Sequence, residues 1–252
     1  MIVTTDHGSV RELRLNRPPA NALSQELIVA LRQAVENAPQ DGVRALVLSG
    51  APGRFSAGLD VPLLLTLDRP GLAALWRGLY ELLRTLALSP IPIAAAITGH
   101  ATAGGTVLPI FCDYRIVAQG DWKLGVNEVQ VGLPLPPIIL AGLKRLVGAR
   151  QAERLAVGGL LISPTEALRI GLIDEIVGLD EVVPRAVEWC RSLAALPVDA
   201  MASTRRRARA DLTDLFASTL DAELDESIAS WWSAEAQTTL RALVQRLAAK
   251  KG

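Results

Sequence analysis

Apolar runs of strand length alternate with longer amphipathic stretches over the first two thirds of this chain of 252 residues. Buried-strand patterns occur at Val43–Leu48, Ile91–Ile97 and Tyr114–Ala118, and a helical pattern such as Gly71–Leu88 separates them. Strands that alternate with helices of this length form crossover units, in which the strands pair mainly in parallel. The sequence therefore predicts an α/β fold whose ligands bind near the carboxyl ends of the strands.

The N-terminal part begins with a short strand pair rather than a crossover unit. Ile2–Thr5 and Ser9–Leu15 indicate two strands joined by a turn, because their apolar residues alternate. Ser24 has the side chain and position of a helix cap, and the apolar spacing that follows predicts a helix to about Ala38.

The C-terminal part has no further strand pattern. After Ile176 the sequence predicts only helices, at Asp180–Leu196, Asp199–Ala210, Asp211–Ala229 and Ser233–Lys250. We therefore expect an α/β core over residues 1–195 and a helical region over residues 196–252.

Composition limits the classes of partner. Hydrophobic residues make up 50% of the chain and charged residues 21%, which is typical of a globular protein. The 26 basic and 26 acidic residues cancel, so no global field attracts nucleic acid or an anionic membrane. Any anionic ligand is expected to be bound by local groups.

The apolar stretches and the two cysteines indicate the location of the protein and the state of its thiols. The longest apolar stretch, around Ile91–Ile97, is interrupted by prolines and is much shorter than the roughly 20 residues that span a bilayer. No secretory signal pattern is visible, so we expect a cytoplasmic protein. Cys112 and Cys190 lie in apolar runs and are expected to be small buried hydrophobes without a metal.

Two glycine-containing loops follow predicted strands. Gly53–Asp60 contains Ser56-Ala57-Gly58, and its small side chains allow a ligand carbonyl to approach the backbone, although an ordinary connecting loop explains it equally well. Gly99–Thr106 opens a helix, where exposed N–H groups suit negative charge that develops on an oxygen. Together the loops could supply an oxyanion hole made of backbone groups.

Other readings of these loops are weaker. The glycine spacing fits neither a dinucleotide loop nor a phosphate-binding P-loop. His100 could serve as a base, but no serine or cysteine nucleophile accompanies it, so a structural hydrogen bond is favoured.

Glu128 is a lone carboxylate among apolar residues. Burial in such a setting would raise its pKa toward about 6–7, which suits a general base. On the local pattern alone, an exposed loop residue remains the favoured reading of Glu128. Its apolar neighbours are Val126, Val129, Val131 and Leu133.

Two clusters mark the helical region. The basic run Arg205–Arg209 is interpreted as a solvated helix face, with a phosphate contact as the alternative. The pair Trp231 and Trp232 needs either a partner surface or a place in the chain's own core.

Several ordered motifs resemble the crotonase superfamily, the enoyl-CoA hydratase and isomerase proteins, over nearly the whole chain. The motifs are Leu15-Asn16-Arg17-Pro18, Phe55–Asp60, Gly99–Gly105, Cys112-Asp113-Tyr114-Arg115, Asn127-Glu128, Ile162–Ala167 and Gly171–Asp174. The resemblance implies a spiral of ββα units and a C-terminal helical region that forms homotrimers or dimers of trimers.

The resemblance also implies the roles of individual residues. The N–H groups of Ala57 and Gly104 would form the oxyanion hole, and Glu128 would be the base. The position of the second glutamate of the hydratases is Val107 here, so the single-glutamate isomerase branch is favoured. Substrate contacts are expected from Ser56, Ala57, Gly58, Leu59, Asp60, Gly104 and Asn127.

The sequence thus predicts an enzyme that shifts a double bond in an acyl-CoA thioester. No metal or separate cofactor is expected, because CoA is part of the substrate. Another superfamily activity (hydratase, thioester hydrolase or decarboxylase) and a non-catalytic CoA-binding or assembly module remain as alternatives.

Overall fold

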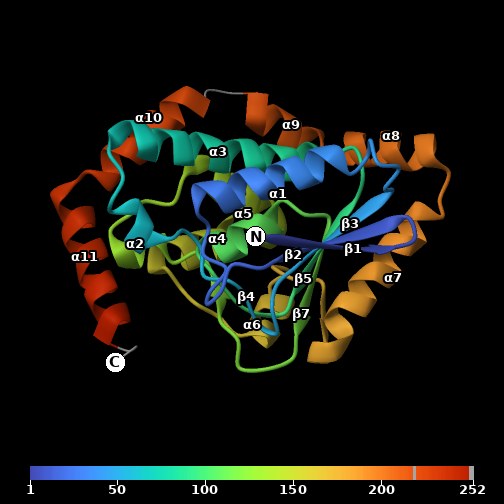
Figure 1. Ribbon diagram of the computed structural model, residues 1–252, viewed down its shortest axis with the longest axis horizontal. Coiled ribbons are helices and arrows are strands. Elements are labelled where there is room, and N and C mark those ends of the chain that lie inside the picture. The colour runs from blue at the N-terminus through green and yellow to red at the C-terminus, as the bar shows by residue number, and fades with distance from the viewer. Residues whose placement is uncertain (218–219, 250–252) are drawn as a thin grey trace.

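A six-stranded sheet forms the centre of the computed structural model, which describes residues 1–217 and 220–249. Its order is β1-β2-β3-β5-β7-β9, and only the β1–β2 pair is antiparallel. The strands are β1 (Ile2–His7), β2 (Val10–Leu15), β3 (Ala45–Ser49), β5 (Ile93–Ile97), β7 (Tyr114–Ala118) and β9 (Glu175–Val177). The expected parallel α/β core is confirmed (Figure 1).

A second, smaller parallel sheet has the order β4-β6-β8. Its strands are β4 (Gly53–Ser56), β6 (Gly99–Thr102) and β8 (Leu124–Gly125). Each of these strands follows a strand of the large sheet along the chain, which produces the spiral of two-strand units. The strands approach closely, because a Cβ atom on Gly99 would lie 1.9 Å from the carbonyl carbon of Gly53.

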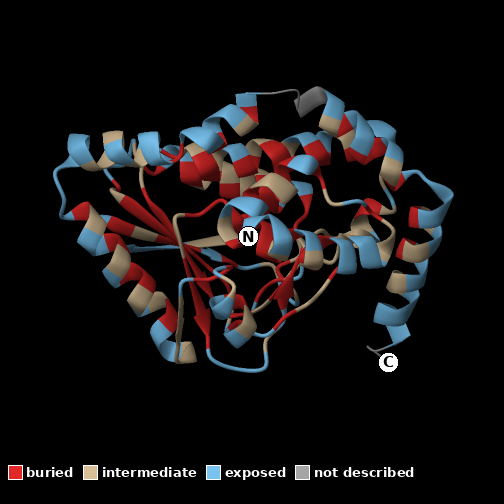
Figure 2. Cartoon of the chain, turned by 180° about the vertical axis from the view of Figure 1, so that it is seen from behind, coloured by how far each residue is buried: buried red, intermediate tan, exposed pale blue. Residues whose placement is uncertain are grey.

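Helices cover both faces of the large sheet. On one face lie α1 (Gln25–Asn37) and α3 (Arg69–Leu88), and on the other lies α7 (Val182–Ala194) (Figure 1). Ser24 caps α1 as expected, since its Oγ accepts from the N–H of Leu27 at 3.3 Å. Figure 2 shows that the strands are mostly buried and that exposed residues gather on the outer helix faces.

Four further helices follow the strands of the small sheet along the chain, and the second of them packs against all three of these strands. They are α2 (Val61–Leu64), α4 (Gly104–Ile110), α5 (Pro137–Gly158) and α6 (Pro164–Arg169). The helix expected to begin near Gly104 is therefore confirmed, and it is short.

The C-terminal region consists of α8 (Val198–Ala208), α9 (Ala210–Ala217), α10 (Leu220–Trp231) and α11 (Ala234–Ala249). The expected helix Asp211–Ala229 corresponds to α9 and α10, and its residues 218 and 219 lie outside the described residues. Lys250, the end of the last expected helix, also lies outside them. Trp231 is 1% exposed within the chain's own core, whereas Trp232 is 39% exposed. The two tryptophan side chains therefore do not form one exposed aromatic surface together, because only Trp232 is exposed.

The interpretation of the basic run as a solvated face is wrong for two of its residues. Arg205 binds both carboxylate oxygens of Asp113, at 2.7 and 2.8 Å. Arg209 is buried, contacts the same carboxylate at 3.0 Å and donates to the carbonyl of Phe111 at 2.7 Å. These contacts attach the junction of α8 and α9 to the core, and only Arg206 and Arg207 remain exposed cations.

We predict that Asp113→Ala lowers the free energy of unfolding by about 3–5 kcal/mol, because removal of one partner leaves buried cationic groups uncompensated. Denaturant unfolding followed by circular dichroism measures this change. Asp211→Ala is the matched control, since its ion pair with Arg145 (2.6 Å) lies at the surface and should contribute less than about 1 kcal/mol. Equal losses in the two variants would contradict the prediction.

Candidate active site

The small sheet brings the two glycine-containing loops into backbone contact. Because β4 pairs with β6, the loop after Ser56 lies beside the loop that leads to Gly104. A Cβ atom on Gly105 would lie 2.1 Å from the Ser56 carbonyl oxygen, and one on Gly58 would lie 2.8 Å from the nitrogen of Gly104. Gly58 also has a φ of 82°, which side chains disfavour. The glycines are thus required by the approach of the two loops.

The first loop is held by residues 20–23. Ser56 is fully buried, and its Oγ donates to the carbonyl of Asn21 at 2.8 Å. Leu23 donates to the carbonyl of Gly58 at 2.8 Å and forms an isolated parallel bridge with Leu59. These hydrogen bonds fix the backbone between Ser56 and Leu59.

Asp60 ends this loop and is occupied by structural contacts. Its carboxylate caps α2 by accepting from the N–H of Leu63 at 3.2 Å, and it forms a 2.5 Å ion pair with Arg17. The predicted contacts of Ser56, Gly58, Leu59 and Asp60 with substrate stay predictions, but these residues shape the loop.

The backbone N–H groups of the two proposed oxyanion donors differ in their hydrogen bonding. Gly104 is buried at the first position of α4, and its N–H has no acceptor among the described residues. The N–H of Ala57 instead donates to the carbonyl of Ala20 at 3.0 Å, although the Ala57 residue itself is exposed. Use of Ala57 as an oxyanion donor therefore requires exchange of this hydrogen bond for one to the substrate.

Glu128 begins the 3₁₀ helix η1 (Glu128–Val131), three residues after the end of β8. Its Oε2 is buried without a hydrogen-bond partner, and the same holds for Oδ1 of the neighbouring Asn127. Burial raises the pKa of Glu128 to about 7. Among the described residues, Glu128 is the only carboxylate with a buried oxygen that lacks a partner.

Glu128 and Gly104 are brought together through Gly125. The N–H of Ala103 donates to the carbonyl of Gly125 at 2.9 Å, which joins the residue before Gly104 to the end of β8. Three residues of extended chain span at most about 10–11 Å, so Glu128 must lie near the helix that Gly104 opens. The arrangement keeps the backbone of Glu128 three residues from the carbonyl that holds Ala103, the residue before the free Gly104 N–H.

The other candidate groups have structural roles. His100 accepts from the N–H of Lys123 at 3.1 Å and packs edge-on against Trp122, so the expected structural hydrogen bond is confirmed. Cys112 and Cys190 are buried, which raises the pKa of both thiols to about 12. Within the described ranges, no group of three or more His, Cys, Asp or Glu side chains is placed to hold a metal ion.

Sequence reasoning missed two residues of this site. Leu23 contacts the loops from a distant part of the chain, since its Cδ1 would lie 2.9 Å from a Cβ atom on Gly104. Thr106 donates to the carbonyl of Ala101 at 2.6 Å and accepts from the N–H of Gly125 at 2.8 Å. A signal for Thr106 was available, because it is the one hydroxyl in the apolar helix Gly104–Ile110.

The raised pKa of Glu128 predicts a pH dependence. Only the ionised carboxylate is a base, so kcat/KM should rise with pH through about 7 and then level off. The same carboxyl group favours folding fully below its ordinary pKa of 4.5, and this contribution is lost as pH rises through about 7. A pH–rate profile with saturating and limiting substrate measures the effect, and a flat profile between pH 5 and about 9 would contradict it.

The two-sheet spiral, the paired glycine loops and the carboxylate with one buried, unpaired oxygen agree with the resemblance to the crotonase superfamily. A sequence profile of the enoyl-CoA hydratase/isomerase family matches residues 5–249. The chain therefore belongs to the enoyl-CoA hydratase/isomerase family of enzymes.

Individual relatives agree with this assignment. The human mitochondrial enoyl-CoA delta isomerase 1 is 31% identical, with 100% of this chain and 85% of the relative covered. A probable enoyl-CoA hydratase of Mycobacterium avium is 37% identical, with 77% of this chain and 75% of the relative covered. The crystal structure of human mitochondrial delta3-delta2-enoyl-CoA isomerase superimposes with a TM-score of 0.95 at 30% identity and covers 100% of this chain and 99% of its own.

Proposed function

We propose that this enzyme isomerises a 3-enoyl-CoA thioester to the conjugated 2-enoyl-CoA. The observation that carries the proposal is the buried, unpaired carboxylate oxygen of Glu128, three residues beyond the Gly125 carbonyl that holds the residue before the free Gly104 N–H. Its similarity to the human isomerase supports the same reaction.

The reaction needs one base and one oxyanion site. The Glu128 carboxylate takes a proton from the α-carbon, and the electron pair moves onto the thioester oxygen, where the N–H groups of Gly104 and Ala57 stabilise the enolate. The enolate then re-forms the carbonyl, the double bond moves from C3–C4 to C2–C3, and Glu128 returns its proton to the γ-carbon. No atom is gained or lost, and conjugation with the thioester favours the product.

Val107 supports this one-base reaction over hydration. Val107 is 1% exposed and lies three residues after Gly104, where the resemblance places the second glutamate of hydratases. A buried valine can neither activate water nor transfer a proton. Hydration is thus the second candidate reaction, and it is favoured by similarities such as that to the probable hydratase of Mycobacterium avium.

Incubation of the purified protein with 3-enoyl- and 2-enoyl-CoA thioesters, with every product identified by mass spectrometry and NMR, tests the proposal. We expect 3-enoyl-CoA to be converted to its conjugated isomer without a change in mass. Addition of water, thioester cleavage or loss of carbon dioxide as the main outcome would replace isomerisation by one of the alternative activities. Tight binding without turnover would indicate a non-catalytic module.

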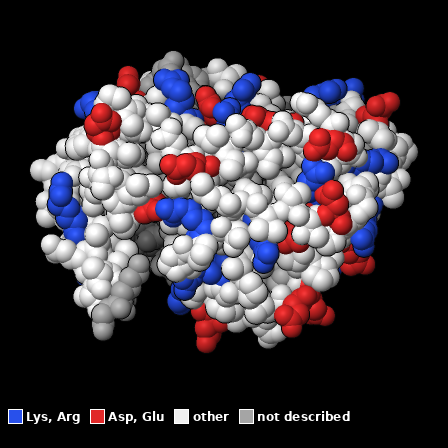
Figure 3. All heavy atoms as spheres, viewed as in Figure 1, with Lys and Arg blue, Asp and Glu red and all other residues white. Residues whose placement is uncertain are grey.

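The proposed function is accompanied by expectations about the substrate, the cofactor, the oligomeric state and the cellular location. The substrate is an acyl-CoA, CoA is part of that substrate, and no separate cofactor enters the proposed reaction. Acidic and basic groups are interspersed on the face shown in Figure 3. Among the described residues, no helix is long and apolar enough to cross a membrane. A homotrimer or dimer of trimers and a cytoplasmic location remain predictions, which light scattering and fractionation measure.

A further inference from the structure

The hydroxyl group of Thr106 joins the loop that carries Gly104 to the strand that leads to Glu128. Thr106 lies in the first turn of α4 and is 4% exposed. Its Oγ1 donates to the carbonyl of Ala101 on β6 at 2.6 Å and accepts from the N–H of Gly125 on β8 at 2.8 Å. One side chain therefore connects α4 with two strands of the small sheet.

A second link passes through Ala103, the residue before Gly104. Ala103 has a φ of 49° and a ψ of −123°, a backbone conformation that is unfavourable for a residue with a Cβ atom. Its N–H donates to the carbonyl of Gly125 at 2.9 Å, and its carbonyl accepts from the N–H of Thr106 at 2.8 Å. The direction of the Gly104 N–H thus depends on a strained residue that Gly125 and Thr106 hold in place.

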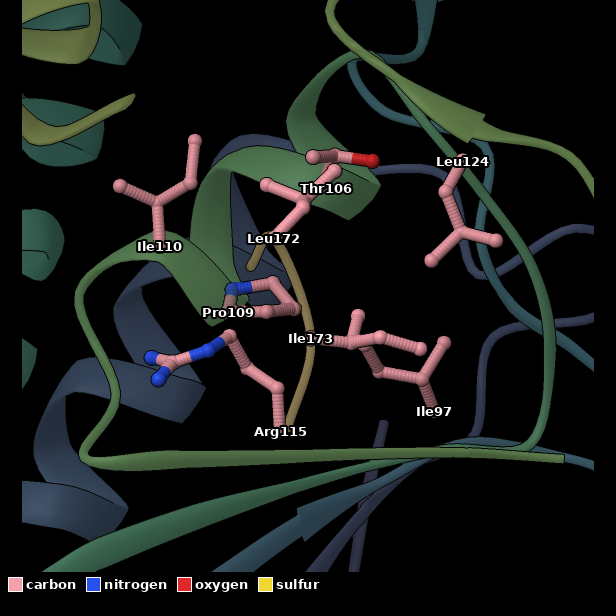
Figure 4. A pocket seen from close by; sticks show the side chains of 8 residues that line it. All are labelled: Ile97, Thr106, Pro109, Ile110, Arg115, Leu124, Leu172 and Ile173. Carbon is pink, nitrogen blue, oxygen red and sulfur yellow. The ribbon is translucent and has the colours of Figure 1, made fainter. Parts of the chain in front are cut away.

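Apart from Thr106, the side chains that line the adjacent cavity include no hydrogen-bond acceptor. Thr106 lines a cavity of about 10 Å³, which is at the lower limit for one water molecule. Figure 4 shows Thr106 above this cavity with its oxygen directed toward the strand of Leu124, and apart from Thr106 and Arg115 the labelled side chains are apolar. A methyl group in place of the hydroxyl would fill its space and leave the Gly125 N–H without a partner.

We propose that Thr106 is a positioning residue of the reaction, whose hydroxyl group fixes the Glu128 carboxylate relative to the Gly104 N–H. The inference rests on the proposed function, because it assigns both groups to one proton transfer. Substrate binding does not require their relative position, but proton abstraction from an enolising thioester does. Thr106 is therefore expected to act on kcat and not on KM.

The test compares Thr106→Val with Thr106→Ser. A displacement of about 1 Å can cost about 100-fold in rate, so we expect kcat of Thr106→Val to fall roughly 10- to 100-fold while KM changes less than about threefold. Thr106→Ser keeps the hydroxyl group and should remain within about threefold of the parent. The midpoint of the pH–rate profile should not move, because Thr106 is not proposed to alter the charge of Glu128.

Thr98→Val is the matched control. Thr98 is also 4% exposed, and its Oγ1 donates to the carbonyl of Ala51 at 2.8 Å, away from Gly125. It should lose stability without a comparable loss of kcat, and thermal unfolding of all variants shows that each is folded. A folded Thr106→Val with parental kcat would overturn the inference, as would equal losses in Thr98→Val or a Ser variant that fails to restore the rate.

Exchange of α-protons with solvent deuterium separates this inference from the proposed function. Exchange needs the base and the oxyanion donor but no movement of the double bond. If the parent exchanges α-protons of an acyl-CoA and forms no conjugated product, isomerisation fails as the function, and the same comparison of variants is made on the exchange rate. A parent with neither activity would overturn both.

Discussion

Glu128→Gln should fold normally, bind acyl-CoA and lose nearly all isomerisation. Glutamine has almost the shape of glutamate and keeps a hydrogen-bonding head group, but its amide is not a useful base. Loss of a general base typically costs about 10²–10⁴ in rate, and here the same group must also return the proton, so we expect a loss of at least about 1,000-fold in kcat. Spectroscopic detection of conjugated enoyl-CoA measures this rate directly.

Stability provides an internal control for this variant. The unpaired, buried Oε2 of Glu128 disfavours the ionised carboxylate, so a neutral amide should not destabilise the protein at pH 8 or above. Glu153→Gln makes the same chemical change on the exposed surface of α5 and should leave the rate unchanged. A Glu128→Gln enzyme with nearly parental turnover would show that the one-base mechanism is wrong.

The structure makes two other carboxylates poor substitutes for Glu128. Asp60 is engaged by Arg17 and by the N-terminus of α2. Asp113 is engaged by Arg205 and Arg209. Both carboxylates are occupied by structural hydrogen bonds and ion pairs, so neither has an oxygen left unpaired as Glu128 has.

The sequence predicted the central strands β3, β5 and β7 well because they are buried on both faces, whereas the short edge strand β9 was not predicted. Strands buried on both faces appear as continuous apolar runs, and Tyr114–Ala118 is observed with the predicted bounds. The cap at Ser24 was equally visible, because a helix cap depends on neighbouring residues alone. The strands β4, β6 and β8 are not indicated by the sequence, since they are short and rich in glycine and carry no periodic pattern.

The sequence indicated which residue types form the site, but it did not indicate their burial or their contact partners. The burial of Glu128 depends on distant packing, since η1 contacts α11, and a Cβ atom on Gly132 would lie 3.0 Å from the Cα of Ala236. The pairing of Arg209 with Asp113 joins residues 96 positions apart. Local sequence patterns do not determine either contact, so the exposed reading of Glu128 and the solvated reading of the arginines were reasonable expectations.

Gly104→Pro should fold but lose about 10²–10³ in kcat relative to Gly104→Ala. Proline has no N–H and fits the first position of a helix, so it removes the free donor while it keeps the start of α4. Loss of one oxyanion donor typically raises the transition-state free energy by about 2.7–4 kcal/mol.

The alanine variant is needed because any side chain at Gly104 disturbs its neighbours. A Cβ atom would lie 2.9 Å from Cδ1 of Leu23 and 3.1 Å from Cα of Gly58, so both variants strain the contact between the loops. Proline removes the N–H and also places its ring carbon Cδ on the nitrogen that packs against Gly58, so the ratio of their rates is assigned to the donor only when both variants bind acyl-CoA equally. Thermal unfolding and acyl-CoA binding establish that both variants are folded. If the two folded variants turn over at the same rate, the Gly104 N–H does not stabilise the enolate, and the Ala57 N–H must leave the Ala20 carbonyl and serve alone.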